Sequence, residues 1–121
     1  MYQLEIIENF SAAHALRDYP GVCARIHGHN WTLKIGLSAE TADERGMTID
    51  YADLKTIADK LIEEFDHNFF NDHPYFKTVN PTSEKIAEYI YGRLESQLPG
   101  RVRLEYVQIA ETENFSVKYR K

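Results

Sequence analysis

The sequence is nearly free of cysteine, since Cys23 is the only one among its 121 residues. A single thiol cannot form an internal disulfide. The first residues, Met1 to Glu5, show neither the basic start nor the apolar stretch with small residues that is typical of an export signal. We therefore expect a cytoplasmic protein in which Cys23 serves reactivity, metal binding or packing.

The sequence also lacks a long apolar run and an excess of positive charge. No run approaches the ~18 apolar residues that span a bilayer, so we expect no membrane segment. Lys and Arg number 14 against 19 Asp and Glu, which argues against a nucleic-acid-binding protein but not against a local basic pocket for a small phosphorylated substrate. The composition is that of a globular chain, and the length suits one domain, residues 1–121.

Two segments near the start alternate between apolar and polar residues, which predicts half-buried strands. The apolar positions are Leu4, Ile6, Phe10 and Ala12 in the segment 2–14, and Trp31, Leu33, Ile35 and Leu37 in the second segment. Turn residues, Asp18 to Gly21, lie in the long connection between them. The pattern predicts an antiparallel hairpin with an elaborated loop.

Two helices are predicted from apolar residues at helical spacing. The first stripe is Leu54, Ile57, Ala58, Leu61, Ile62 and Phe65, and the second is Ile86, Ala87, Ile90, Tyr91, Leu94 and Leu98. Asp50 is the predicted N-cap of the first helix, the run Asn80 to Glu84 begins the second, and Pro99-Gly100 ends it. Two further strands, 102–111 and 115–119, complete the chain.

The resulting order, β-β-α-α-β-β, predicts an α+β fold in which both helices cover one face of an antiparallel sheet. Such a sheet leaves one face and two edges open. Because open edges tend to associate, we expect an oligomer.

The sharpest local motif is His27-Gly28-His29. On a strand, residues two apart project to the same face, so both imidazoles can reach one ion. His14 has the same parity as the apolar residues of its own strand, so all three histidines should lie on the helix-covered face. Three neutral imidazoles with an open fourth position are typical of a catalytic zinc site.

Cys23 stands four positions before His27 and has three possible roles. A thiol beside a metal ion and a cation such as Arg25 could act as a base or nucleophile. It could instead be a fourth ligand that closes a structural site, or a buried side chain. The spacing does not distinguish catalysis from ligation.

Two further motifs indicate functional residues only when they are considered together with the histidines. Asp66-His67 could be an acid–base imidazole with its orienting carboxylate, or simply a polar helix end. Glu111 could accept two parallel N–H bonds from a guanidine-like edge, although most glutamates at strand ends are solvated.

In combination these motifs resemble the 6-pyruvoyl-tetrahydropterin synthase superfamily. The resemblance rests on Cys23 to Asn30 with His14 before them, and on four shorter runs that follow in the family's order: 49–54, 65–67, 80–84 and 111–112. It covers nearly the whole chain. The three-residue gap between Cys23 and His27 resembles the bacterial 6-carboxy-5,6,7,8-tetrahydropterin synthase branch, whereas the pyruvoyl-forming branch has a longer gap.

The resemblance implies a tunnelling fold (T-fold), in which subunits form an oligomeric barrel, commonly a homohexamer made as a dimer of trimers with active sites at subunit interfaces. It implies a zinc-dependent lyase that converts 7,8-dihydroneopterin triphosphate to 6-carboxy-tetrahydropterin, acetaldehyde and triphosphate for queuosine synthesis. The alternatives are 6-pyruvoyl-tetrahydropterin synthase activity and a zinc-stabilised binding module without catalysis.

The resemblance also implies residue roles. His14, His27 and His29 would hold Zn²⁺, Cys23 would be the general base, and His67 its acid–base partner oriented by Asp66. Glu111 would anchor the pterin and join the proton relay, with Thr82 and Ser83 as further pterin contacts. Arg17, Arg25 and Lys34 are candidate cations for the triphosphate, and no spacing selects among them.

Overall fold

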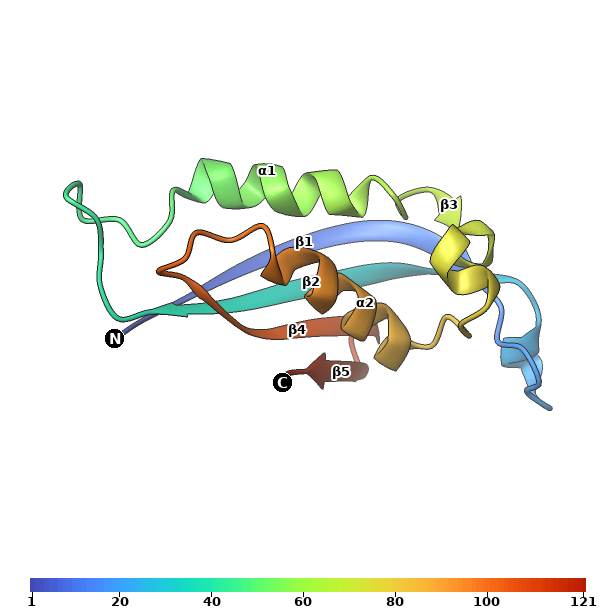
Figure 1. Ribbon diagram of the computed structural model, residues 1–121. Helices are drawn as coiled ribbons and strands as arrows, with labels where there is room; N and C mark the ends of the chain where they lie inside the picture. The colour runs from blue at the N-terminus through green and yellow to red at the C-terminus, as the bar shows by residue number, and fades with distance from the viewer.

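The computed structural model describes all residues, 1–121, and contains five strands and two α-helices (Figure 1). In chain order these are β1 (Tyr2–His14), β2 (His27–Ala39), α1 (Tyr51–Ile62), β3 (Asn68–Phe69), α2 (Ser83–Glu95), β4 (Arg103–Thr112) and β5 (Phe115–Tyr119). Three short 3-10 helices lie between them: η1 (Val22–Ala24), η2 (Phe70–Asp72) and η3 (Pro74–Lys77).

The strands form one sheet in the order β3-β1-β2-β4-β5. Its centre is the predicted antiparallel hairpin of β1 and β2, which runs the length of the molecule (Figure 1). The predicted order of elements is confirmed, with one addition. Strand β3 pairs parallel with β1 through Ala12 and Asn68, and its two residues are too few to produce an alternating pattern in the sequence.

Both α-helices pack on one face of the sheet, α1 along β1 and α2 over β4 and β5 (Figure 1). The inward-facing strand residues and the two helical stripes form the core. The least exposed large side chains there are Trp31, Phe65, Phe70, Phe76, Leu33, Ile35, Leu37, Leu54, Ile86, Ile90, Leu94 and Ile109. This arrangement confirms the predicted α+β class.

The helix starts agree with the predicted caps, but both helices end early, α2 at Glu95 and so before the predicted end at Pro99-Gly100. Asp50 accepts a hydrogen bond from the Ala52 amide at 2.8 Å, as an N-cap does. Helix α1 ends at Ile62, so Phe65 lies beyond it, and packs with Phe70 at a ring-centroid distance of 4.7 Å. The apolar stripe continues past the helix because the next turn is also buried in the core.

The other face of the sheet has no helix. It carries a set of residues that contact one another, which we call the Tyr106 cluster (Glu5, Gly36, Tyr106 and Lys118). The Tyr106 ring lies over Gly36, where a Cβ atom would overlap it. The Tyr106 hydroxyl donates a hydrogen bond to Glu5, and the Lys118 ammonium lies 4.2 Å from the ring centroid. Each polar group of this cluster therefore has a partner.

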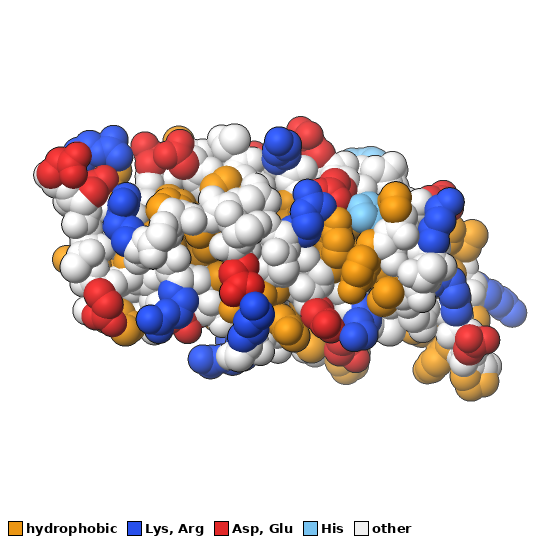
Figure 2. All heavy atoms as spheres, in the orientation of Figure 1, with side chains coloured by type: hydrophobic (Ala, Val, Ile, Leu, Met, Phe, Trp, Pro, Cys, Tyr) orange, Lys and Arg blue, Asp and Glu red, His pale blue; other side chains and the backbone are white.

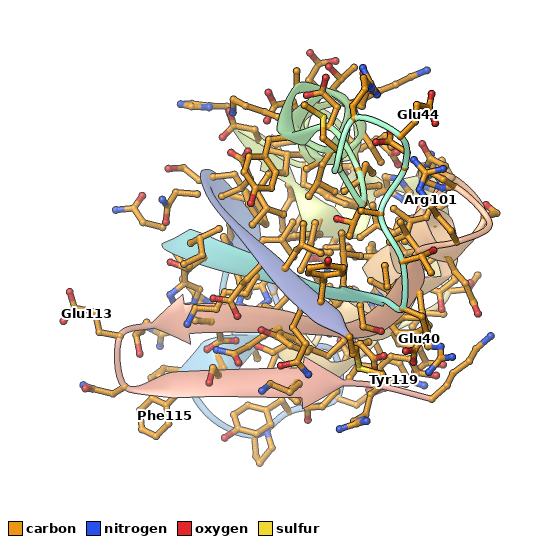
Figure 3. All side chains as sticks on the ribbon, turned by 90° about the vertical axis from the view of Figure 1, so that its left-hand side faces the viewer. Glu40, Glu44, Arg101, Glu113, Phe115 and Tyr119 are labelled. Carbon is orange, nitrogen blue, oxygen red and sulfur yellow. The ribbon has the colours of Figure 1, made fainter.

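The molecular surface shows charges of both signs scattered over the face seen in Figure 2. Strand β5 forms one edge of the sheet, and Phe115 at its start points away from it and is 73% exposed (Figure 3). None of the helices is both long and apolar enough to cross a membrane.

Candidate metal centre

Three histidines meet at the end of the β1–β2 hairpin. The strand register places His14 opposite His27, and Ala12 opposite His29. Residues paired in this way share a face of the sheet, so the register confirms that all three imidazoles lie on the helix-covered face. One ligand nitrogen from each ring lies within 4.8 Å of the other two, which is close enough for the three to bind one metal ion.

Backbone carbonyls fix the orientation of two of these rings. His14 Nδ1 lies 2.8 Å from the Pro81 carbonyl oxygen, and His27 Nδ1 lies 2.8 Å from that of Arg25. A carbonyl oxygen can only accept, so each Nδ1 carries the proton, and in the neutral ring each Nε2 is left with a free lone pair. This is the usual way in which proteins fix the tautomer of a metal-binding histidine.

The indole of Trp31 forms one wall of the centre. Its ring centroid lies 5.0 Å from that of His14 and 5.2 Å from that of His29, both edge to face. The indole Nε1 donates to the Ala12 carbonyl at 3.0 Å, so it does not compete for the imidazole lone pairs. The wall excludes water from one side of the histidines, because Trp31 is fully buried.

Burial favours the neutral form of His14 and of His29. It lowers the pKa of His14 below the ordinary value of 6.5, and the other two imidazoles lower it further, against the Pro81 hydrogen bond and Glu111, which raise it. Burial likewise lowers the pKa of His29. A neutral imidazole is the form that binds a metal.

Two buried nitrogens in the cluster lack any hydrogen-bond partner. Nε2 of His14 and Nε2 of His29 are the only buried side-chain nitrogen or oxygen atoms in the chain of which this is true. Such atoms are costly, and each one in a native structure requires an explanation. A metal ion held by three imidazole nitrogens would satisfy both atoms, so the residues fit a metal centre of the three-histidine type.

Glu111 lies beside the same nitrogens. Its carboxylate oxygens are 3.7 Å from His14 Nε2 and 3.8 Å from His29 Nε2, too far for hydrogen bonds. Strand β4 shifts register next to Glu111, between Ala110 and Thr112. Glu111 has the parity of the buried Val107 and Ile109, and this alternation could have placed it on the helix-covered face from the sequence.

The comparison with known proteins identifies the family. The family model described as 6-pyruvoyl tetrahydropterin synthase matches residues 3–121. The chain belongs to the 6-pyruvoyl tetrahydropterin synthase family. Its T-fold is also that of a solved Caenorhabditis elegans 6-pyruvoyl tetrahydropterin synthase, with a TM-score of 0.90, 30% identity, and coverage of 99% of this chain and 95% of that one.

Other relatives in this family carry different names. A Synechocystis protein named 6-carboxy-5,6,7,8-tetrahydropterin synthase is 34% identical over 92% of this chain and 87% of its own. A Pyrococcus furiosus protein named dihydroneopterin monophosphate aldolase is 32% identical over 91% of this chain and 90% of its own. Membership of the tetrahydropterin synthase family therefore establishes the enzyme class, and the particular reaction has to be argued from the site.

The start of α2 contributes two of the predicted residues. Ser83 Oγ donates to a Glu111 carboxylate oxygen at 3.1 Å, so it belongs to the centre. Thr82 is the N-cap of α2, and its hydroxyl accepts from the Lys85 amide at 3.2 Å. The Pro81 carbonyl, which orients His14, was missed in the sequence because a backbone carbonyl leaves no mark in the residue pattern.

Cys23 lies near the centre along the chain but outside the ligand group. It is half-buried in η1, and its carbonyl accepts from the Leu16 amide at 2.9 Å. Its sulfur is not among the ligand atoms that lie within 4.8 Å of one another. The three histidines, without Cys23, are therefore the group that could hold a metal ion.

Asp66 and His67 lie at a different surface, next to β3. An Asp66 carboxylate oxygen accepts from the Ser11 amide at 3.0 Å and lies 3.0 Å from His67 Nδ1. The bond from Ser11 lowers the pKa of the Asp66 carboxyl. The His67 side chain is 81% exposed and lines a hollow of about 530 Å³ together with Ser11, Ala12, Ala13, Gly28, His29, Asn30, Asn68 and Phe69.

The three candidate phosphate cations differ in their surroundings. The Arg17 guanidinium donates to two backbone carbonyls. Lys34 pairs with Ile7 and Gln108 in neighbouring strands, at a position of opposite parity to the buried Leu33 and Ile35. Arg25 is exposed. The surroundings of Arg17 thus distinguish it from the other two.

Proposed function

We propose that this chain, acting as one domain over residues 1–121, is a zinc-dependent 6-carboxy-5,6,7,8-tetrahydropterin synthase. The substrate is 7,8-dihydroneopterin triphosphate, which with water gives 6-carboxy-tetrahydropterin, acetaldehyde and triphosphate for queuosine synthesis. The observation that carries the proposal is the convergence of three imidazole nitrogens, two of them buried without a partner. The short gap between Cys23 and His27 and the Synechocystis relative favour the carboxy-forming reaction.

His14, His27 and His29 hold the metal in this proposal. A Zn²⁺ ion held there would supply a Lewis acid for the hydroxyl groups of the substrate side chain. The Pro81 and Arg25 carbonyls keep two of the rings in the tautomer that leaves Nε2 free. Trp31 and the burial of His14 keep water away from that side of the site.

Cys23 is the proposed general base that moves protons along the substrate side chain. His67 is its acid–base partner, and the 3.0 Å contact with Asp66 orients the imidazole. Glu111 accepts hydrogen bonds from the N–H groups of the pterin edge. Ser83, whose hydroxyl bonds to Glu111, and Thr82 line the pterin end of the proposed site. The triphosphate then leaves from the other end of the side chain.

The complete site is proposed to form between subunits of a homohexamer. The exposed His67 and the hollow beside it face outward from this chain. Strand β5 has one unpaired edge, and β1 is paired by β3 only at Ala12 and Ala13. Open edges of this kind favour association with another copy. Light scattering at micromolar concentration should detect an oligomer, and a stable active monomer would refute this part.

The deciding experiment is product analysis. Zinc-loaded protein is incubated with 7,8-dihydroneopterin triphosphate, and the products are identified by mass spectrometry. Carboxy-tetrahydropterin with acetaldehyde supports the proposal. A pyruvoyl product, in which the three-carbon side chain is kept, assigns the protein to the other branch. No turnover by folded, zinc-bound protein favours a non-catalytic module.

The role of Cys23 is tested with Cys23→Ala. Because its sulfur lies outside the ligand group, the variant should bind one zinc ion per site as the wild type does, while turnover falls by about 100-fold or more, the usual contribution of a general base. Metal content and rate are measured on the same preparation. Loss of zinc together with Cys23 would instead indicate a fourth ligand and a closed site.

The role of Glu111 is tested with Glu111→Gln. Removal of the acceptor charge should weaken binding of a pterin ligand by about 10- to 100-fold, because its donors lose a charged partner. Glu113→Gln, an exposed carboxylate in the turn that follows β4, is the matched control and should bind normally. Equal affinity in the two variants would remove this assignment.

A further inference from the structure

The chain that follows β1 is tied to the linker between η3 and α2 by paired hydrogen bonds. The Arg17 amide donates to Asn80 Oδ1 at 2.9 Å, and Asn80 Nδ2 donates back to the Arg17 carbonyl at 3.4 Å. The Asn80 side chain thus binds the backbone of Arg17 much as a neighbouring strand would. This bond pair fixes Asn80 relative to the end of β1.

The Arg17 side chain strengthens the same connection. Its Nη1 donates to the Val79 carbonyl at 3.2 Å and its Nη2 to the Phe76 carbonyl at 2.6 Å. Hydrogen bonds from a charged donor are among the stronger ones in proteins. The side chain is half-buried and forms no ion pair within the chain, and two of its five N–H donors bond to the linker.

The next carbonyl along the linker is the one that orients His14. Pro81 follows Asn80 directly, is buried, and accepts from His14 Nδ1 at 2.8 Å. The proline ring fixes φ at this residue, so ψ of Pro81 is the one soft backbone angle between the anchored Asn80 and this carbonyl oxygen. Arg17 and Asn80 therefore restrict where the acceptor that sets the His14 tautomer can lie.

We infer that Arg17 and Asn80 form a clamp that holds the Pro81 carbonyl against His14 and thereby raises the zinc affinity of the centre. Arg17 is a positioning residue for the metal site and not a binding cation for the triphosphate. The same segment carries Leu16, whose amide bonds to the Cys23 carbonyl at 2.9 Å, so the clamp also steadies the loop with the proposed base. The inference rests on the proposed zinc centre.

The first test measures Zn²⁺ affinity by competition with a chromophoric chelator, in apo protein reloaded with zinc. Arg17→Ala should bind zinc about tenfold more weakly than the wild type, the lower end of the 10- to 100-fold range for partners of metal ligands. The matched control is Arg101→Ala. Arg101 also donates to a carbonyl, that of Thr48 at 3.0 Å, but lies at the end of the molecule that faces the viewer in Figure 3.

A conservative variant separates geometry from charge. Arg17→Lys keeps the positive charge but cannot bond two carbonyls in the fixed fork of a guanidinium, so it should also lose zinc affinity. If Arg17 instead bound the triphosphate, Arg17→Lys and Arg17→Ala would raise KM and leave the zinc affinity unchanged. Wild-type zinc affinity in both variants would overturn the inference.

The second test reads the His14 tautomer without metal. In ¹⁵N-histidine NMR spectra of apo protein at pH 8, wild-type His14 should show a single Nδ1–H form, and Arg17→Ala should show a mixture. An unmixed signal in the variant would overturn the clamp. Wild-type protein that binds no zinc would refute the metal centre, and the NMR result would still decide whether the clamp orients His14.

Discussion

The two faces of the sheet each hold a cluster of polar side chains, and the clusters differ in how their atoms are satisfied. In the Tyr106 cluster the hydroxyl bonds to Glu5 and the ring lies between Gly36 and Lys118. In the histidine cluster the Nε2 atoms of His14 and His29 are buried without a hydrogen-bond partner. The Glu111 carboxylate lies nearby but beyond hydrogen-bond distance.

Both clusters contain titratable groups in close contact, so proximity alone does not distinguish structure from function. The two buried nitrogens without a hydrogen-bond partner do distinguish the clusters. Folding has desolvated the two imidazole nitrogens without giving them a hydrogen bond, which costs about 1–3 kcal/mol for each such group. The Tyr106 cluster carries no such cost. We therefore expect the histidine cluster to respond to metal and the Tyr106 cluster to respond only to changes in packing.

The largest expected effect is that of His29→Ala on zinc binding. Removal of one of three ligands should weaken zinc binding by more than about 100-fold. This exceeds the loss of about 10- to 100-fold expected when a group that only orients a ligand is removed. The unfolding free energy of the apo protein should fall by less than about 1 kcal/mol, since the lost Nε2 had no partner. Zinc titration and chemical denaturation provide both values, and unchanged zinc affinity would contradict the metal centre.

The next effect is that of Gly36→Ala on stability. The added Cβ overlaps the Tyr106 ring, so the ring has to leave Gly36 or the strands have to shift, at a cost of about 1–3 kcal/mol. Zinc affinity should stay the same. Gly92→Ala in α2 is the opposite control, because nothing lies within 4 Å of its added Cβ and alanine favours a helix by about 1 kcal/mol. Equal stability of the two variants would contradict the packing of Tyr106.

The smallest expected effects are those of pH on the stability of the apo protein, one in the acid range and one in the alkaline range. The pKa values of His14 and His29 are lowered by burial, so the unfolded state binds more protons and the apo protein should lose stability as the pH falls below about 6.5. Burial raises the pKa of Tyr106 from 10.0 to about 12. Stability from this group is present below pH 10 and should be lost between pH 10 and 12. Denaturation across the pH range measures both. Tyr106→Phe should reduce the alkaline loss, to which Tyr89 and Tyr91 also contribute through raised pKa values, and should leave the acid loss unchanged.

Much of this fold could be predicted from the sequence, because its long elements are strongly periodic. The alternation of Trp31, Leu33 and Ile35 predicted β2, and parity alone placed His14, His27 and His29 on one face. These features depend on local geometry, in which a side chain's direction follows from its position in the strand.

The rest depends on contacts between distant parts of the chain. Strand β3 forms because the turn after α1 meets Ala12, and two residues carry no periodic signal. The bonds from His14 to Pro81 and from Arg17 to Val79 join residues more than 60 positions apart. Arg17 was grouped with the phosphate-binding candidates because its sequence context gives no hint that its donors are used by carbonyls.

One backbone feature of the hollow beside β3 has an evolutionary consequence. His67 has a φ of 59°, in the left-handed region that glycine adopts without strain and that costs other residues about 1–2 kcal/mol. Replacement of His67 by glycine should therefore raise the unfolding free energy, and it removes the imidazole. Selection for stability alone would favour glycine at this turn, and the proposed acid–base role of His67 would supply the reason for a histidine there.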